Sequence, residues 1–535
     1  MPVNAVRTRT TVAPRRVTAP TFTVPAVLRR ENLRLTPWGV VAILSVLVLG
    51  SLWLRVRSLD FHYWIDEGLS VGISSHPLRD IPSLLRQDGS PPLYYLLLHV
   101  WMGVFGKREV ATHVLSLLFV LVTIPAAYWA GTSLFDRRAG VISAVLAAGV
   151  PYLTVYAQET RMYALLALLA LIVAGSFVHA FVRRHRRYLP LFSASLAAAL
   201  YTHNWALFLG VTSAVAFLLC VRVAEPEQRR LLWRDGLVAF GGVVVLYAPW
   251  LPTLLYQARH TGAPWALPPV LWSLSQGLYS LVGGRGAAMV LLLAGGSGLV
   301  ALKAVDDRPR RLRLAAACLV VLGIGTLLTA WVYATVTPSW AIRYLAVIVG
   351  PLIPLFGLGL ARAGRLGLVA LALAVCFWVL DPIAHSLNSK SNVAAVAAKF
   401  RRDLGPDSLV LSTQPEQVPT IAYYLPRVSH YATPMGPVAD PRVFDWADAL
   451  RRLRRSSVRS TLLPLVNSLA PGDHLLMVLP MQSQTTPLWL KLIYRYSEQW
   501  SAALNHDHLL RRVAVTSSGS FPSGLPVKAV LYIRR

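Results

Sequence analysis

The sequence predicts a polytopic α-helical membrane protein that ends in a small α/β domain. Its 535 residues are 55% hydrophobic and only 14% charged, a composition typical of membrane-embedded chains and not of soluble globules. Long apolar runs separated by short basic bursts continue to about residue 387 and then stop. From Asn388 onward, short apolar stretches alternate with polar helical patterns, which indicates a second domain outside the membrane.

The chain begins with a basic segment and a first apolar run. Residues 1–35 are rich in Arg, Thr and Pro, and we predict that they form a disordered basic cytoplasmic tail. The run 38–54 has the length of a membrane span, and no small-residue cleavage site follows it. This first span is therefore expected to carry the chain to the outer face of the membrane.

About eleven spans are predicted for a transmembrane catalytic domain at 36–387. Segment 92–106 is not among them, because it is short and charged residues follow it. We assign it, together with an amphipathic helix at 68–86, to the first outer loop, 58–108. The expected spans are 38–54, 110–131, 141–157, 161–182, 188–202, 205–222, 237–255, 286–303, 314–334, 344–361 and 366–385.

The net charge of +28 does not indicate a nucleic-acid partner. The basic residues fall in short loops between apolar runs, as the positive-inside rule predicts for the cytoplasmic loops of a multi-pass plasma-membrane protein. In this orientation the N-terminus is cytoplasmic and the C-terminal domain 388–535 is extracytoplasmic. The residue types that can carry out chemistry then gather in the outer loops, whereas the inner loops hold little besides Arg, Asp and small residues.

Two adjacent carboxylates, Asp66 and Glu67, follow the first span. A carboxylate beside a membrane is costly unless it stays hydrated or gains a partner. In the catalytic interpretation, Asp66 is a general base for an acceptor hydroxyl, and Glu67 orients or binds the acceptor. In the structural interpretation, both acids stabilise the first turn of a helix. The aromatic residues before them and the clustering of outer-loop motifs favour catalysis.

Asp88 lies in the same outer loop, before Gly89 and a Pro-Pro pair. It can act as a second carboxylate that binds sugar hydroxyls, the acceptor or a divalent cation. It can equally form a turn that caps the next helix. Both interpretations stay open, and the sequence does not define a cofactor.

Other outer loops supply groups that can bind a phosphate. An Arg suits this task because its planar guanidinium donates two parallel hydrogen bonds and stays charged. The structural alternatives are an Arg161 paired with Glu159 and a His203 that caps a helix within the aromatic belt. The expected binding set is Asp88, Glu159, Arg161, Tyr163, His203 and Arg343.

The C-terminal domain is predicted to be a small α/β unit with one modest core. A helical segment is expected at 392–402 and a strand at 408–412, with a Gly-Pro-Asp turn before the strand. Further strands are expected at 473–479, 513–515 and 527–533. This domain is suited to holding an acceptor glycan.

The outer-loop motifs occur in an order that resembles a known family. An aromatic-Asp-Glu sequence follows the first span, Pro91-Pro92-Leu93-Tyr94-Tyr95 comes next, and Arg161-Met162-Tyr163 follows the next span pair. This layout is similar to that of the GT-C superfamily of integral-membrane glycosyltransferases, in particular the family 39-like protein O-mannosyltransferase and aminoarabinose transferase group. The resemblance implies a polyprenyl monophosphate sugar as donor and Asp66 as the catalytic base.

One position departs from the family pattern. The aminoarabinose transferases have a Lys before the Pro of the first loop, where this chain has Ser90. The contact with the donor phosphate must then come from Arg161, Arg343 or another Arg. A lipid phosphate leaves as a stable anion, so cationic stabilisation and one base suffice for displacement with inversion.

The expected function is the transfer of a sugar, with mannose as one candidate, to a cell-envelope glycan, lipoglycan or glycolipid at the outer face of the plasma membrane. Two other classes are considered. A transporter of lipid-linked sugar or polysaccharide would need inverted repeats and polar residues within its spans, and neither is clear in the sequence. A non-catalytic envelope scaffold would tolerate Asp66→Asn, whereas an enzyme would lose transfer.

Overall fold

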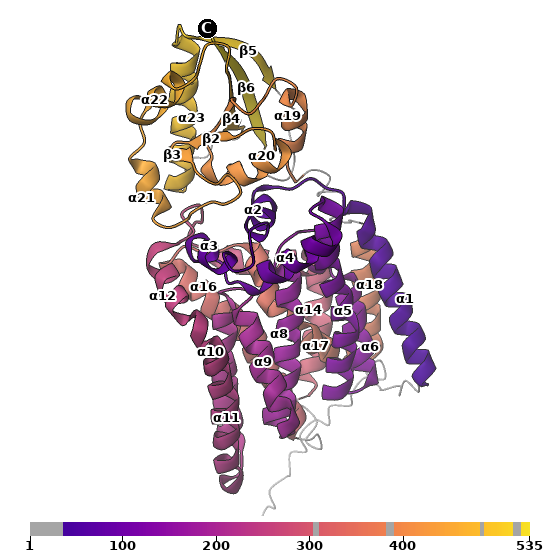
Figure 1. Cartoon of the computed structure of the whole chain (residues 1–535). Coiled ribbons are helices and arrows are strands. Elements are labelled where there is room, and N and C mark those ends of the chain that lie inside the picture. Colours follow the sequence, from indigo (N-terminus) through magenta and orange to yellow (C-terminus); the bar gives the residue numbers. More distant parts are fainter. Residues whose placement is uncertain (1–35, 303–309, 381–389, 482–485, 517–525) are drawn as a thin grey trace, which may run out of the picture.

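The computed structural model describes residues 36–302, 310–380, 390–481, 486–516 and 526–535. The predicted tail 1–35 lies outside these residues. Figure 1 shows a bundle of long helices and, at one end of it, a C-terminal domain in which helices surround a sheet. Three short helices of the first outer loop lie between the two parts: α2 (Ile65–Ser74), α3 (Ile81–Asp88) and α4 (Leu93–Phe105).

Seven helical segments among the described residues are long and apolar enough to cross a membrane, and two bent pairs raise the number to nine. The predicted number of spans, about eleven, is therefore not confirmed. The seven are Pro37–Ser58 (α1, η2), Glu109–Leu134 (α5), Tyr163–Val182 (α8, η3), Ala206–Val223 (α10), Pro226–His260 (α11, η5, α12), Arg310–Val336 (α15, η6, α16) and Ile342–Arg362 (η7, α17).

The remaining apolar helices are bent or short. Helices α6 (Arg137–Gly149) and α7 (Pro151–Ala157) meet at 49°, and α13 (Leu271–Val282) and α14 (Arg285–Val300) meet at 90°. Two expected spans are shorter than 18 residues: α9 (Leu189–Leu200) and, among the described residues, α18 (Arg365–Leu380).

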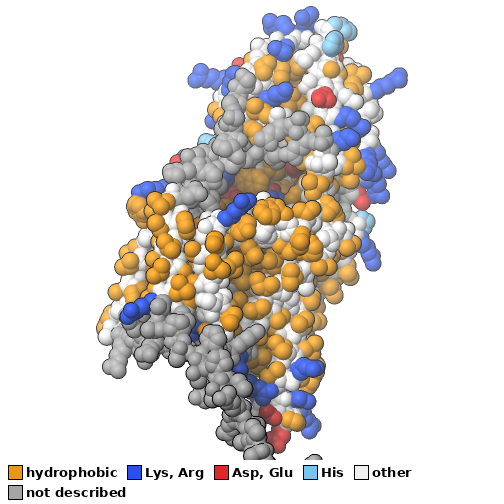
Figure 2. Space-filling view, turned by 180° about the vertical axis from the view of Figure 1, so that it is seen from behind, with side chains coloured by type: hydrophobic (Ala, Val, Ile, Leu, Met, Phe, Trp, Pro, Cys, Tyr) orange, Lys and Arg blue, Asp and Glu red, His pale blue; other side chains and the backbone are white. Residues whose placement is uncertain are grey.

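Burial divides the bundle into a centre and a periphery. The most apolar windows of α8–η3 and η7–α17 are 89% buried within the protein, whereas that of α1–η2 is only 11% buried. Figure 2 shows that apolar side chains dominate the outer surface of the helices. The exposed apolar surface is suited to contact with lipid chains.

The first outer loop differs from its prediction in one respect. The segment 68–86, expected as one amphipathic helix, forms parts of two helices, because α2 ends at Ser74 and Pro77 lies in the connection to α3. A proline lacks a backbone N–H and restricts the residue before it, so it favours such a break. The apolar segment expected at 92–106 is the short helix α4.

The C-terminal domain is built on a six-stranded mixed sheet with strand order β3-β2-β1-β4-β6-β5. Strand β1 pairs in parallel with β2 and β4, and the other pairs are antiparallel. A sheet domain in this part of the chain confirms the coarse prediction. Its elements are α19 (Val393–Phe400), β1 (Leu409–Ser412), η9 (Pro415–Gln417), α20 (Val418–Tyr424), β2 (His430–Thr433), β3 (Gly436–Val438), α21 (Ala449–Arg454), η10 (Val458–Leu462), α22 (Leu463–Asn467), β4 (His474–Pro480), α23 (Leu488–His506), β5 (Leu510–Thr516) and β6 (Val527–Arg534).

The two parts meet closely at α2, which packs against α20. A Cβ atom at Gly68 would lie 2.2 Å from Thr420 Oγ1, and one at Gly72 would lie 1.9 Å from the carbonyl oxygen of Arg442. Any side chain at these two positions would therefore push the C-terminal domain away. Glycine lets this domain lie directly on the helix that carries Asp66 and Glu67.

Candidate active site

Asp66 lies in the first turn of α2, beside two arginines from other segments. Its Oδ2 atom is 3.5 Å from Nε of Arg343 and 3.8 Å from Nη2 of Arg161. Neither contact is a hydrogen bond, and Oδ2 accepts none from the described residues. Each of the two guanidinium groups beside Asp66 can pair with an oxyanion, which suits an anionic ligand.

The Arg161 guanidinium is held in place from several sides. Its Nη1 atom donates to Ser70 Oγ at 3.0 Å and to the backbone oxygen of Asp66 at 3.2 Å. The same atom lies 3.4 Å from the Tyr95 hydroxyl, and Nη2 lies 3.5 Å from that of Tyr163. Helix α2 thus orients both Asp66 and the cation opposite it.

Arg343 is instead held mainly by aromatic rings. Its guanidinium carbon lies 4.7 Å from the ring centre of Trp265, 5.4 Å from that of Tyr344 and 5.7 Å from that of Trp64. Such rings attract a cation through their quadrupole while competing little for its hydrogen-bond donors. Nε of Arg343 is buried and donates no hydrogen bond to the described residues.

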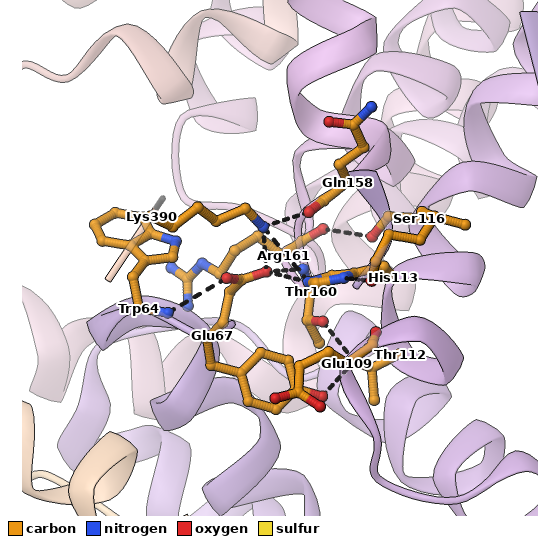
Figure 3. A network of polar contacts seen from close by, with 12 residues as sticks. Trp64, Glu67, Glu109, Thr112, His113, Ser116, Gln158, Thr160, Arg161 and Lys390 are labelled. Carbon is orange, nitrogen blue, oxygen red and sulfur yellow. Dashed lines mark hydrogen bonds and ion pairs between the residues drawn. The ribbon is translucent and has the colours of Figure 1, made fainter. Parts of the chain in front are cut away.

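Glu67 points away from Asp66 and into a buried polar network (Figure 3). Its Oε1 atom lies 2.6 Å from Nε2 of His113 and 3.0 Å from Nζ of Lys390. The backbone N–H of Thr160 donates to the same oxygen at 2.8 Å. Burial disfavours the charged form, yet the charges of Lys390 and His113 and the donated hydrogen bonds hold the pKa of Glu67 well below its ordinary value.

This network joins four separate parts of the chain. Lys390 also donates to the backbone oxygen of Gln158, and Nδ1 of His113 lies 2.7 Å from the backbone oxygen of Leu59. The first outer loop, the start of α5, the loop 158–161 and the start of the C-terminal domain therefore meet at one carboxylate.

Two other carboxylates predicted for the site have raised pKa values. Burial and the like charge of Asp66 raise the pKa of Asp88 to about 6, with Ser90 and Arg161 opposing the change in part. Burial together with Glu67 and Asp66 raises the pKa of Glu159, although Lys390 acts in the opposite direction. Oε2 of Glu159 has no hydrogen-bond partner among the described residues.

His203 is buried beside the two arginines. Burial and the charges of Arg161 and Arg343 lower its pKa to about 3, so its ring is neutral at physiological pH. Its Nδ1 atom accepts a hydrogen bond from the backbone N–H of Trp205 at 3.0 Å, which leaves the proton on Nε2. The neutral ring can therefore donate one hydrogen bond and does not act as an acid. The Tyr163 ring lies nearby, tilted by 54° to the His203 ring, with 6.0 Å between the ring centres.

The site lies where the helical bundle meets the C-terminal domain. Figure 2 shows a hollow between the two parts, with acidic and basic side chains visible inside it. Among the residues that the structure describes, no group of three or more His, Cys, Asp and Glu side chains is arranged to hold a metal ion.

Sequence reasoning missed two members of the buried network, His113 and Lys390. His113 could have been noticed as an ionisable residue near the end of a predicted span, where such residues need partners. Lys390 shows no local pattern, because its partner Glu67 lies 323 residues earlier in the chain. The tertiary fold alone brings the two together.

The fold defines a class of protein. The helical part and the C-terminal domain that lies over the first outer loop together form a fold that solved structures of an oligosaccharyltransferase and an arabinofuranosyltransferase share. The resemblance predicted from the motifs is confirmed, because the family model and the solved structures similar to this chain are of that kind.

The particular matches are as follows. Residues 89–256 match the model of the dolichyl-phosphate-mannose-protein mannosyltransferase family. The structure of ArnT from Cupriavidus metallidurans bound to undecaprenyl phosphate is 13% identical, with a TM-score of 0.60 over 93% of this chain and 98% of that one.

Two further structures show the same fold. The archaeal oligosaccharyltransferase AglB from Archaeoglobus fulgidus, in complex with an inhibitory peptide and a dolichol-phosphate, is 13% identical, with a TM-score of 0.52 over 82% of this chain and 69% of that one. The arabinofuranosyltransferase AftD from Mycobacteria is 13% identical, with a TM-score of 0.52 over 95% of this chain and 40% of that one. No curated protein sequence matches the chain.

Proposed function

We propose that this protein transfers a sugar from a polyprenyl monophosphate to a cell-envelope glycan, lipoglycan or glycolipid at the outer face of the plasma membrane. The observation that carries the proposal is the position of Asp66, 3.5 Å from Arg343 and 3.8 Å from Arg161. Displacement of a phosphate leaving group requires a general base for the acceptor hydroxyl and cations for the phosphate, and these three side chains supply both. The lipid phosphates bound by ArnT and AglB, which share this fold, support the choice of donor.

The proposed reaction is a single in-line displacement. An acceptor hydroxyl attacks the anomeric carbon, its proton passes to Asp66, and the bond between that carbon and the phosphate oxygen breaks. The electron pair of this bond leaves with the polyprenyl phosphate, whose negative charge Arg161 and Arg343 stabilise. Attack opposite to the leaving group inverts the anomeric carbon.

The contacts of Asp66 would allow the two arginines to release its carboxylate and bind the phosphate instead. Its ion pairs with both arginines are longer than hydrogen bonds, and Nε of each arginine is without a hydrogen-bond partner among the described residues. An entering phosphate can therefore take up guanidinium donors that Asp66 leaves free. The arginines that pair with Asp66 here would then pair with the phosphate, which leaves the carboxylate free to face the acceptor hydroxyl. His203 is placed to donate one more hydrogen bond to phosphate or sugar.

We assign Glu67 a structural positioning role in place of the role predicted from the sequence, which was to orient or bind the acceptor at the catalytic site. Its side chain has no exposed surface, and three groups bind one of its oxygens. It cannot touch a substrate in this arrangement. It fixes the start of α2, which carries Asp66, to the loop 158–161, which carries Arg161.

An apolar groove on the bundle is suited to the lipid chain of the donor. It lies between α13, α14, α17 and α18, and one of its walls is Val150 at the start of α7. Two residues further along α7, the Tyr152 hydroxyl donates to the backbone oxygen of Arg343 at 2.6 Å. Helix α7 thus connects a wall of the groove to the backbone of Arg343. Its lining includes Val150, Leu278, Leu281, Val349, Leu352 and Trp378.

The proposal is tested by comparing envelope glycans of cells that lack this chain with those of cells that express the wild type, Asp66→Asn or the control Asp60→Asn. Asp60 lies in the same loop but is exposed. We expect the wild type and Asp60→Asn to restore one sugar to the envelope glycans. Asp66→Asn, present at equal abundance, should transfer this sugar at least about 100-fold more slowly. Restoration by Asp66→Asn would contradict the proposal.

The proposed orientation is tested by fusing a reporter enzyme after Arg535 that is active only outside the cytoplasm.

A further inference from the structure

A cavity of about 460 Å3 lies in the C-terminal domain, beside α21. Its walls come from the β2–β3 turn, the end of α21, η10 and α22. Prolines and Met435 form apolar parts of the wall. The polar side chains that line it are Arg452, Arg455, Ser456, Ser460, Thr461 and Ser468.

Two of these polar side chains have an unpaired atom, and one of the two, Arg452, is held in place by Asp445. Arg452 forms an ion pair with Asp445, with 3.0 Å between Nη1 and Oδ2, and it also donates to the backbone oxygen of Asp445. Its Nε atom is buried without a hydrogen-bond partner among the described residues, as is Oγ of Ser456. Buried polar groups usually find partners in the protein or in a bound molecule, so unpaired donors beside a cavity indicate a ligand.

The charged side chains that line the cavity are all basic. No acidic residue is among its described lining residues, whereas Arg455 is exposed and forms no ion pair with the described residues. The basic segment continues on either side with Arg451, Arg454 and Arg459. Under the proposed orientation this segment lies outside the cytoplasm, where the positive-inside rule gives no reason for a run of arginines.

The cavity also lies near the junction of the two parts. Just before α21, the backbone N–H of Trp446 donates to Gln87 O at 3.0 Å, and that of Asp448 donates to His260 O at 2.8 Å. Arg452 follows Asp448 by about one helical turn. Figure 1 shows α21 at the end of the C-terminal domain that faces α3 and α12.

We propose that this cavity, the α21 cavity, binds an anionic group, phosphate or carboxylate, carried by a sugar of the acceptor glycan. Guanidinium groups and hydroxyls are the donors that such oxyanions prefer, and the hydroxyls also suit neighbouring sugar oxygens. The inference rests on the proposed function in naming the ligand as the acceptor. The α21 cavity would then hold one end of the acceptor while another end reaches Asp66.

The test measures binding to the purified full-length protein in detergent, with glucose 6-phosphate, glucuronate and glucose as probes in ligand-observed NMR. Arg455→Gln removes a cavity cation. Arg454→Gln is the matched control, because it removes the same charge from the neighbouring position at the end of α21 without lining the cavity. Thermal unfolding verifies that each variant is folded. Asp66→Asn is included because the α21 cavity does not use that residue, which separates failure of this inference from failure of the proposed function.

We expect the two charged sugars to bind and glucose not to bind. Arg455→Gln should weaken binding about tenfold or more, as the loss of one charge-assisted contact predicts. Arg454→Gln should bind as the wild type does, and Asp66→Asn should bind no more weakly than the wild type. Absence of binding, equal binding of glucose, or equal loss in Arg454→Gln would overturn the inference. A preference for phosphatidylglycerol vesicles that depends on Arg455 would also overturn it, because the ligand would then be a lipid headgroup.

Discussion

A buried carboxylate such as Glu67 keeps its charge only where several donors compensate for the lost water. Here Lys390, His113 and the Thr160 amide share that task, and each comes from a different part of the chain. Removing one partner of such a pair leaves an uncompensated charge, which costs more than the pair itself contributes. The side chain next to Asp66 is therefore a junction whose loss is expected to displace the catalytic groups.

Lys390→Met and Glu67→Gln are each expected to destabilise the protein by about 3–5 kcal/mol, because each removes one partner of a buried ion pair. The double variant should lose less stability than the two single variants lose in sum, since both charges are then removed. Thermal unfolding in detergent measures the changes. Glu225→Gln is the control, because Glu225 pairs with Arg310 at the surface, where both side chains are 66% exposed. Strict additivity of the two single variants would refute the coupling.

Asp88 is expected to make stability depend on pH. Burial raises its pKa to about 6, above the ordinary value of 3.8, so the folded state binds this proton more tightly than the unfolded state. Its contribution to stability is complete below pH 4 and is lost as the pH rises through 6. Asp88→Asn should therefore raise the unfolding temperature relative to the wild type at pH 7.5 more than at pH 4.5. An equal change at both pH values would show that Asp88 does not titrate in this way.

At the scale of elements, helix α2 links the chemistry to the C-terminal domain. Its first turn carries Asp66, Ser70 on its next turn accepts from Arg161, and Gly68 and Gly72 allow the C-terminal domain to approach. The two interpretations of the acidic pair drawn from the sequence are thus compatible. Both acids lie in the first turn of a helix, and the two side chains point to different surroundings.

Gly68→Ala is expected to separate α2 from α20, because the added Cβ would lie 2.2 Å from Thr420 Oγ1 and 2.7 Å from Thr420 Cα. Overpacking of this kind typically costs about 1–3 kcal/mol. We expect a lower unfolding temperature and reduced sugar transfer. Gly50→Ala in α1 is the control, since a Cβ there meets nothing within 4 Å. If Gly68→Ala had the same unfolding temperature and sugar transfer as Gly50→Ala, neither stability nor transfer would depend on the close contact between α2 and α20.

At the scale of the whole molecule, the sequence predicted the kind of architecture better than its details. Apolar runs of spanning length indicated a helical membrane protein, because the bilayer imposes that length. The number of spans could not be read in the same way, since the angle between neighbouring helices, such as the 90° between α13 and α14, decides whether they form one span or two. The order β3-β2-β1-β4-β6-β5 places β1 between β2 and β4, a crossover that strand patterns do not encode.

The candidate site was predictable to a similar degree. Arg161 and Arg343 stood out because a cation at a span end needs a partner, and the structure places both beside Asp66. The burial of Glu67 was not predictable, because its partner Lys390 comes from the C-terminal domain. The sequence showed which charged residues were candidates, and the fold determined which of them pair.

The central claim is that Asp66, Arg161 and Arg343 act on one lipid phosphate, and binding of undecaprenyl phosphate to the purified protein tests it most directly. Arg161→Gln and Arg343→Gln should each weaken binding about tenfold or more, whereas Arg259→Gln, an exposed control, should not. Asp66→Asn should bind at least as tightly as the wild type, because it removes the anion that competes for both arginines. Unchanged binding in Arg343→Gln, or weakened binding in Asp66→Asn, would contradict the account.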